Sequence, residues 1–497
     1  MNVLDSELVR GQLLALGYQF VDDWKQAQVI LYNTCSVREH AEQKVLSRIG
    51  LVGMQKKTQE DIVLGIIGCQ AEREGEDLIR KYPQIDLLCG PGELDKVPML
   101  IDNVVKTGIE QRGGLKSAQS ALQGNTHRRS STLSAAADQL EMLDLARTFS
   151  PDEHHGSAYV RITRGCNKFC AFCVVPNTRG AEVHRPPDNI VDECKRLVDS
   201  GVVEATLIGQ TVNHYHYDHS ASVVVDGIQQ PQIGAVVKPG GHNGSDDITT
   251  FANLLYRIHE EVPQLQRLRF VTSFPRDFGD DILQVMRDCP RICRYLHLPV
   301  QSGSDRVLKV MNRGHTITEY RDLLQRSREF LPDAQFASDI ICGFPTETDE
   351  DHDLTCDLIR ESMFKNCFIF KYSPRPGTAA YDRLPDDVPD EIKRKRNNEL
   401  LAIQTENSAQ IHKSFVGKDV RVFVESISQK AAKQLQPANG GNVILGWEND
   451  EQLVTQLCGR TDGDLIVMFE GDTSLVGSIV DVHVDRAAPL ALFGKAI

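Results

Sequence analysis

Three cysteines in the middle of the chain are spaced to bind one metal cluster. Cys166, Cys170 and Cys173 follow a C-x3-C-x2-C pattern, directly after an apolar stretch at 159–163. One tight loop can therefore present three thiolates to a four-iron cluster and leave one iron open. An open iron can chelate the amino and carboxylate groups of S-adenosylmethionine (SAM). One electron would then cleave SAM to a 5′-deoxyadenosyl radical, while the protein orients the reactants and excludes water.

A zinc site and a chance cluster are the alternatives for this motif. Zinc sites usually combine two short Cys or His clusters, and no second cluster of that kind lies nearby in the sequence. Phe172, just before the third cysteine, offers an aromatic ring that could pack on the adenine of SAM. The preceding strand, the loop and this ring together favour the iron–sulfur interpretation.

Length and composition limit the remaining possibilities. A chain of 497 residues suggests about three domains at roughly 150 residues each. The net charge of −14 argues against a protein that coats nucleic acid by bulk electrostatics. The 13 cysteines form no regular disulfide framework, which indicates a reducing compartment. Because the sequence has no secretory signal and no apolar run long enough to cross a bilayer, we expect a cytoplasmic location and no membrane partner.

Alternating helices and strands are predicted to position the cysteines. A helix at 6–16 and apolar strands at 27–32, 61–67 and 85–88 predict an N-terminal parallel α/β domain. From residue 159 a second α/β series predicts a partial (β/α)6 barrel, whose functional residues should lie at the C-terminal ends of the strands. The six strands of this barrel are expected at 159–163, 204–208, 267–272, 295–298, 334–341 and 367–372.

The last part of the chain changes to short strands separated by turns. This pattern predicts a small all-β barrel or sandwich, a class that often binds oligonucleotides. Its strands are expected at 420–424, 453–458, 465–469 and 478–484.

Two polar stretches interrupt the pattern of helices and strands. Residues 117–137 are rich in Ser, Ala and Gln and are interpreted as part of a linker. Residues 214–247 are interpreted as a surface insertion. The insertion opens with His214-Tyr-His-Tyr-Asp-His219, for which we weigh a metal site and prefer a solvated loop.

Sequence motifs throughout the chain resemble the radical SAM methylthiotransferase family, and most closely its branch of tRNA-2-methylthio-N6-dimethylallyladenosine synthases. The motifs are NTCSVRE (33–39), GCQA (68–71), GCNKFCAFCVVPNTRG (165–180), LIGQTVN (207–213), HLPVQSGSD (297–305), SDIICGFPTET (338–348) and SPRPGT (373–378). The resemblance implies three parts, the last being a β-barrel called TRAM that binds RNA. We expect an N-terminal methylthiotransferase domain at 1–112, a linker at 113–151, a radical SAM core at 152–385, a helical connector at 386–413 and a TRAM domain at 414–485.

The resemblance also implies a second [4Fe–4S] cluster that delivers sulfur, held by three cysteines of the N-terminal domain. Two of them would be Cys35 and Cys69, each at the end of a predicted strand. Taken alone, each could equally be a buried structural cysteine. The third ligand of the family precedes Met1 and is missing from this chain start, so we expect a start assigned too late. Cys89 is the candidate substitute.

The SAM contacts implied by the resemblance lie at strand ends. Gly180, Ala181 and Glu182 match a segment that holds the SAM amino group through backbone carbonyls, although the family usually has Glu where Ala181 stands. The further expected contacts are Gly209, Gln210, Ser302 and Gly343. For these four residues the alternative explanation is that their types are required by ordinary tight turns.

The activity implied is the conversion of N6-(dimethylallyl)adenosine, next to the anticodon of tRNA, to its 2-methylthio derivative. Expected partners are the tRNA anticodon stem-loop and a low-potential electron donor of the flavodoxin or ferredoxin type, with a monomeric enzyme. Two alternatives stay open: methylthiolation of a ribosomal-protein aspartate, and a non-catalytic iron–sulfur RNA-binding protein. The stretches NTCSVR (33–38) and GQTVN (209–213) favour the tRNA branch.

Overall fold

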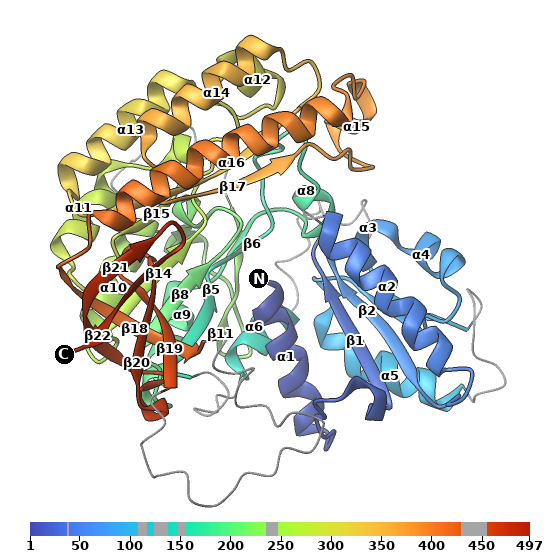
Figure 1. Cartoon of the computed structure of the whole chain (residues 1–497). Helices are drawn as coiled ribbons and strands as arrows, with labels where there is room; N and C mark the ends of the chain where they lie inside the picture. Colours follow the sequence, from blue (N-terminus) through green and yellow to red (C-terminus); the bar gives the residue numbers. More distant parts are fainter. Residues whose placement is uncertain (37–38, 108–116, 124–137, 148–154, 235–246, 429–454) are drawn as a thin grey trace, which may run out of the picture.

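The computed structural model describes the chain except for residues 37–38, 108–116, 124–137, 148–154, 235–246 and 429–454. The N-terminal α/β unit lies on one side, the larger α/β unit on the other, and the C-terminal barrel beside the latter (Figure 1). This architecture confirms the predicted fold class. Within the described residues, no helix has the length and apolar character needed to cross a membrane.

The N-terminal unit contains a parallel sheet in the order β1-β2-β3-β4, with helices on both faces. The central strand β2 is buried along its whole length, because Leu64 and Ile66 pack toward α2 and α4 while Val63 and Ile67 pack toward α1 and α5. The elements are α1 (Asn2–Ala15), β1 (Val29–Thr34), α2 (Glu39–Gln55), β2 (Val63–Gly68), α3 (Cys69–Glu74), α4 (Glu76–Lys81), β3 (Leu87–Cys89), α5 (Val97–Lys106) and β4 (Gln119–Ala121).

Strand β4 differs from the prediction. Its residues were placed in the linker, yet they pair with β3 at the edge of the sheet. Helix α6 (Gln139–Leu145) also falls within the predicted linker. Residues 124–137 of that linker lie outside the described residues, and the predicted domain limits stay predictions.

The larger unit contains the six predicted parallel strands in two neighbouring sheets, β5-β8-β14 and β15-β16-β17. A hydrogen bond from the Cys293 N–H to the Leu268 carbonyl brings the two sheets together at 2.9 Å. The strands are β5 (Ser157–Arg161), β8 (Glu204–Ile208), β14 (Arg267–Val271), β15 (Tyr295–His297), β16 (Gln335–Cys342) and β17 (Asn366–Lys371).

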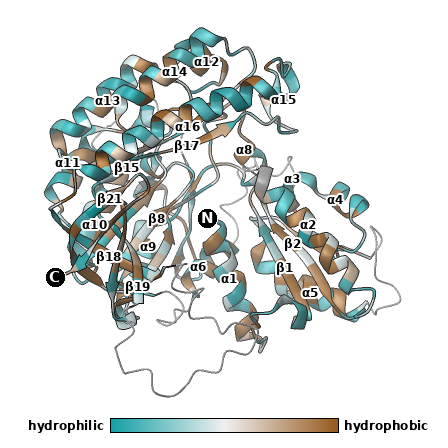
Figure 2. Cartoon of the chain, viewed as in Figure 1, coloured by the Kyte–Doolittle hydropathy of each residue, from teal (hydrophilic) through white to brown (hydrophobic). Residues whose placement is uncertain are grey.

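Helices cover the outside of this curved sheet, with hydrophilic residues on their outer faces (Figure 2). They are α9 (Pro187–Asp199), α10 (Phe251–Glu261), α11 (Asp280–Asp288), α12 (Asp305–Val310), α13 (Ile317–Phe330), α14 (Asp349–Ser362), α15 (Ala379–Arg383) and α16 (Asp390–Lys413). Two short elements, β6 (Thr163–Arg164) and α8 (Val175–Thr178), flank the cysteine loop.

The predicted surface insertion is partly built into the fold. β12 (Gln232–Ile233) pairs with β7 (Val183–His184), and β9 (His216–Asp218) pairs with β13 (Ile248–Thr250). β10 (Val224–Val225) and β11 (Ile228–Gln229) form a hairpin. The prediction of a solvated loop at 214–219 is therefore wrong at its start, because His214, Tyr215 and Tyr217 are buried.

The C-terminal unit is a closed barrel in the order β18-β19-β20-β22-β21. The last strand, β22, lies beyond the predicted end of this domain at residue 485 and pairs with both β20 and β21, so it closes the barrel. Arg267 and Arg269 of β14 donate hydrogen bonds to barrel carbonyls of Arg460, Arg421 and Thr461. The strands are β18 (Asp419–Ile427), β19 (Thr455–Thr461), β20 (Ile466–Gly471), β21 (Ile479–Ala488) and β22 (Ala491–Ala496).

Candidate functional site

The three central cysteines share one short loop between β6 and α8. Burial raises the pKa of Cys166 to about 12. Burial also raises the pKa of Cys173, and the charges of Cys170 and Cys166 raise it further, so the three thiols act on one another. Because thiolates are the form that ligates iron, a bound cation would have to offset this cost of ionisation. The donor set fits a metal cluster with three protein ligands.

Neighbouring segments hold the cysteine loop in place. The Cys166 N–H donates to the Gly180 carbonyl at 3.2 Å, and the Ala171 N–H donates to the Met311 carbonyl at 2.8 Å. Gly165 has a φ of +66°, and a Cβ there would lie 2.0 Å from the Ala181 carbonyl oxygen. The loop and the segment 180–182 are thus packed directly against each other, which requires glycine at this position.

Arg313 is a residue of this site that the sequence analysis missed. Its Nη1 lies 3.4 Å from the Cys170 Sγ, and its guanidinium stands 4.6 Å over the ring of Phe274. The side chain is buried and also donates to the Pro299 carbonyl. Arg313 therefore places a buried positive charge beside one of the three candidate ligands. The RG pair at 313–314, between two helical stretches, carries no signal for such a contact in the sequence.

The predicted SAM contacts fall into two groups. The first group, Gly180 to Glu182, adjoins the cysteine loop. The Gly180 carbonyl accepts a hydrogen bond from the Cys166 N–H, and the Glu182 carbonyl accepts one from the Gly234 N–H. A carbonyl oxygen has a second lone pair, so these groups keep a free acceptor position. Phe172 lies beside the same loop and packs edge-on against Phe344, with ring centroids 6.4 Å apart.

The remaining predicted contacts have local partners. A Cβ on Gly209 would lie 2.1 Å from the Thr163 Oγ1, and one on Gly343 would lie 2.3 Å from Lys393. The Ser302 hydroxyl accepts from the Ser304 N–H at 3.2 Å. Close packing in tight turns accounts for these residue types, so their role in binding SAM, and that of Gln210, stays a prediction.

Cys35 and Cys69 directly follow the adjacent parallel strands β1 and β2. The residues before them, Thr34 and Gly68, are paired partners in β1 and β2. Asn2 lies at the same edge, because the Asn33 Nδ2 donates to the Asn2 carbonyl at 2.8 Å. Cys89 lies apart from this pattern: it belongs to the core of the sheet, and its thiol donates to the Glu93 carbonyl at 3.1 Å.

Arg179 connects this edge to the cysteine loop of the larger unit. Burial alone would lower its pKa, but Asp5 and Cys69 outweigh that effect by charge and by hydrogen bonds, so its pKa is raised. Its Nη2 donates to the Asp5 Oδ2 at 2.7 Å and to the Asn2 Oδ1 at 3.0 Å. The adjoining helices α3 and α8 pack against each other. One short segment, 173–179, therefore joins the two groups of cysteines.

Comparison with known sequences identifies the family. Residues 160–359 match the Radical SAM superfamily and residues 1–90 match "Uncharacterized protein family UPF0004". A tRNA-2-methylthio-N(6)-dimethylallyladenosine synthase of Rhodopirellula baltica is 39% identical over 498 residues, which cover 100% of this chain and 93% of the relative. The chain belongs to this synthase family. The synthase of Aeromonas hydrophila is 36% identical over 496 residues, covering 100% of this chain and 89% of the relative.

The solved structures support the fold of this synthase family member. A radical S-adenosylmethionine methyltransferase, TsrM, from Kitasatospora setae has a TM-score of 0.52 at 16% identity, covering 76% of this chain and 71% of that chain. That structure contains cobalamin and a [4Fe–4S] cluster. The predicted family is thus confirmed, and membership of the Radical SAM superfamily implies a [4Fe–4S] cluster and SAM.

Proposed function

We propose that this chain is a radical SAM methylthiotransferase that converts N6-(dimethylallyl)adenosine, next to the anticodon of tRNA, to its 2-methylthio derivative. Its similarity to synthases of that name extends over the whole chain. The observation that carries the proposal is the placement of two cysteine groups on either side of Arg179, since methylthiolation needs a radical centre and a sulfur source within reach of one base.

The radical centre is assigned to the cysteine loop. Cys166, Cys170 and Cys173 would hold one [4Fe–4S] cluster, which when bound supplies the electron that cleaves SAM. Arg313 would place a positive charge beside this cluster, since its Nη1 lies 3.4 Å from the Cys170 Sγ. Cys166 is buried, whereas Cys170 and Cys173 are partly exposed. The segment 180–182 and Phe172, which lie beside the loop, would orient SAM.

A second [4Fe–4S] cluster is assigned to the edge with Cys35 and Cys69. The Asn2 carbonyl lies beside this edge, because it accepts from the Asn33 Nδ2 at 2.8 Å. Arg179 places a buried positive charge beside Cys69. Cys89 is not part of this assignment, since its thiol is buried in the core of the sheet and donates to the Glu93 carbonyl.

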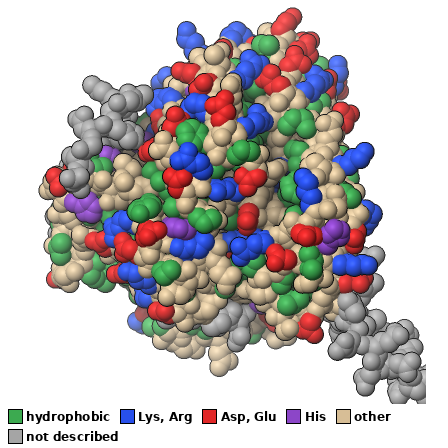
Figure 3. Space-filling view, turned by 90° about the vertical axis from the view of Figure 1, so that its left-hand side faces the viewer, with side chains coloured by type: hydrophobic (Ala, Val, Ile, Leu, Met, Phe, Trp, Pro, Cys, Tyr) green, Lys and Arg blue, Asp and Glu red, His purple; other side chains and the backbone are tan. Residues whose placement is uncertain are grey.

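The tRNA substrate would bind by shape and stacking as much as by charge. On the face shown in Figure 3, Lys and Arg side chains are interspersed with Asp and Glu and form no large patch of one sign. Single-stranded loops offer unstacked bases, which a protein can splay out and recognise. We assign the TRAM-like barrel to anticodon stem-loop binding and a flavodoxin or ferredoxin to electron delivery.

The test is a reaction of reconstituted enzyme, SAM, a chemical reductant and an anticodon stem-loop that carries N6-(dimethylallyl)adenosine. Formation of both 5′-deoxyadenosine and the 2-methylthio nucleoside is expected. A parallel reaction with a ribosomal-protein substrate should give no product. 5′-Deoxyadenosine without any tRNA product would point to another substrate, and absence of 5′-deoxyadenosine from iron-loaded protein would indicate a non-catalytic homologue.

The second cluster is tested by an iron count on reconstituted protein. Protein made from Met1 and protein that includes the upstream codons are compared. About eight irons per chain in the longer form and about four in the shorter form would place the third ligand before Met1. About eight irons in the shorter form would reassign that ligand, and about four in both would remove the second cluster from the proposal.

A further inference from the structure

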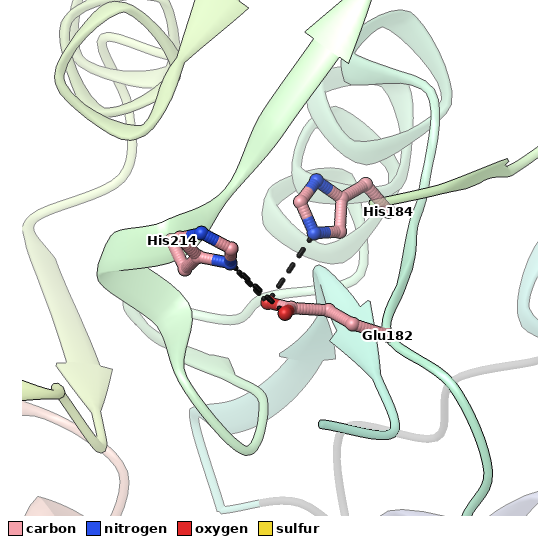
Figure 4. A group of neighbouring side chains, drawn as sticks. All are labelled: Glu182, His184 and His214. Carbon is pink, nitrogen blue, oxygen red and sulfur yellow. Dashed lines mark hydrogen bonds and ion pairs between the residues drawn. The ribbon is translucent and has the colours of Figure 1, made fainter. Parts of the chain in front are cut away.

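Two histidines and one glutamate converge in the interior beside the cysteine loop. Glu182 directly precedes β7, His184 ends β7, and His214 ends the 3-10 helix Val212–His214. Glu182 and His184 are 0% exposed and His214 is 8% exposed. Figure 4 shows both imidazole rings turned toward the carboxylate. The synthase activity proposed above uses none of these three side chains.

The distances between these groups are short enough for one ion to contact all three side chains. His214 Nδ1 lies 2.9 Å from both carboxylate oxygens of Glu182, and His184 Nε2 lies 3.3 Å from the Oε1. This last contact lacks the geometry of a hydrogen bond, so His184 Nε2 is buried without a hydrogen-bond partner. A fully buried ring nitrogen without a hydrogen bond is costly, and beside this carboxylate either protonation of the imidazole or a bound metal ion would offset that cost.

The other nitrogen of His184 contacts the backbone of His216. Nδ1 lies 2.6 Å from the His216 carbonyl oxygen and accepts from the His216 N–H at 2.8 Å. When Nδ1 accepts from the N–H, Nε2 carries a proton toward Glu182; when an Nδ1–H donates to the carbonyl, Nε2 has a lone pair facing Glu182, and metal binding requires this second tautomer. Histidines that ligate metals commonly donate their second N–H to a backbone carbonyl in this way.

The ligand set and its spacing suit a transition-metal ion. Two imidazole nitrogens and one carboxylate are a recurrent ligand set of zinc, with bonds of about 2.0–2.2 Å, so that neighbouring ligand atoms in a tetrahedral site lie about 3.3 Å apart. The Glu182 Oε1 lies 2.9 Å from His214 Nδ1 and 3.3 Å from His184 Nε2, and both separations are close to that value. The Thr211 hydroxyl donates to the Glu182 Oε1 at 3.1 Å and fixes the orientation of the carboxylate.

We propose that Glu182, His184 and His214 bind one divalent transition-metal ion, for which zinc has the best-matched ligand preferences. The ion joins β7 to the end of the Val212–His214 helix. The Glu182 N–H donates to the Asn167 Oδ1 at 3.1 Å, so the ion also fixes the segment on which the cysteine loop rests. Its role is structural, and it is separate from the iron bound by cysteines.

The first test is metal analysis of the holoenzyme, purified anaerobically from zinc-supplemented cells and dialysed against a weak chelator. Zinc and iron per chain are measured by mass spectrometry, and the zinc environment by X-ray absorption. The expected result is about one zinc per chain with a nitrogen and oxygen shell at about 2.0–2.2 Å and no sulfur shell near 2.3 Å. Zinc-free protein, or a sulfur shell from zinc in the cysteine sites, would overturn the proposal.

Variants locate the ion. His184→Ala and His214→Ala should each lower the zinc content at least tenfold while the iron content per chain stays unchanged. His352→Ala is the matched control, because His352, Cys356 and Glu399 form the other candidate metal cluster found among the described residues. Zinc retained in the His184→Ala, His214→Ala double variant would refute the assignment. If the variants do not fold, the absorption spectrum of the wild type decides on its own.

Discussion

Asp5 of the N-terminal unit forms buried ion pairs with two arginines of the radical SAM unit. This carboxylate is 0% exposed and pairs with Arg161 at 3.2 Å and with Arg179 at 2.7 Å. Arg161 keeps a second partner in Asp144, whereas Arg179 would be left with Asn2 and Cys69. The Asp5→Asn substitution keeps the shape of the side chain and removes its charge. The cost of breaking such a buried pair is about 3–5 kcal/mol.

Hydrogen exchange of α1 measures this cost, because α1 lies between the two units and packs on Ile208 through Leu4 and Leu8. A loss of about 3 kcal/mol corresponds to exchange more than a hundredfold faster in α1. Asp77→Asn is the control, since its pair with Arg80 is exposed on both sides and is worth less than about 1 kcal/mol. Unchanged exchange of α1 in Asp5→Asn would refute the view that this charge cluster joins the units.

Three further predictions concern the cysteine loop and its surroundings. Cys166→Ala should remove about four irons per chain and abolish 5′-deoxyadenosine formation, whereas Cys194→Ala, in the core, should leave the iron count unchanged. Gly165→Ala should also lose this iron because its Cβ would meet the Ala181 carbonyl, whereas Gly201→Ala, with the same sign of φ and open space, should keep it. His315 has its pKa lowered to about 4 by burial and then by Arg313, so the unfolded chain binds the extra proton. The contribution of His315 to the free energy of unfolding is complete above about pH 6.5 and decreases as the pH falls toward 4. His315→Gln should therefore flatten this part of the pH profile of stability, measured by denaturant unfolding.

Much of the fold could be predicted because its strands are apolar runs bounded by turn residues. All six strands of the radical SAM unit were predicted within two residues of their observed limits. β4 was missed because Gln119–Ala121 has no apolar pattern and is a strand only by pairing with β3. β22 was missed because only Leu492 points into the barrel core. Tertiary pairing, rather than local propensity, decides such short edge strands.

The site was predicted less completely, and for a physical reason. The cysteine spacing is local, so a sequence can show it. The contacts of Arg313 with Cys170 and of Asp5 with Arg161 join residues 143 and 156 positions apart, and no spacing rule connects them. The histidine stretch did carry a signal that was overlooked. Buried Tyr215 and Tyr217 alternate with less buried neighbours, as in a strand with one inward face.

The most direct test of the central claim is nucleoside mass spectrometry of tRNA from cells. A strain that lacks its own 2-methylthio-N6-dimethylallyladenosine synthase would express either this chain, with its upstream codons, or the Cys166→Ala variant. We expect the wild type to restore the 2-methylthio nucleoside and the variant to leave N6-(dimethylallyl)adenosine unmodified. Failure of the iron-loaded wild type to produce the methylthio nucleoside, or its formation by the variant, would contradict the account.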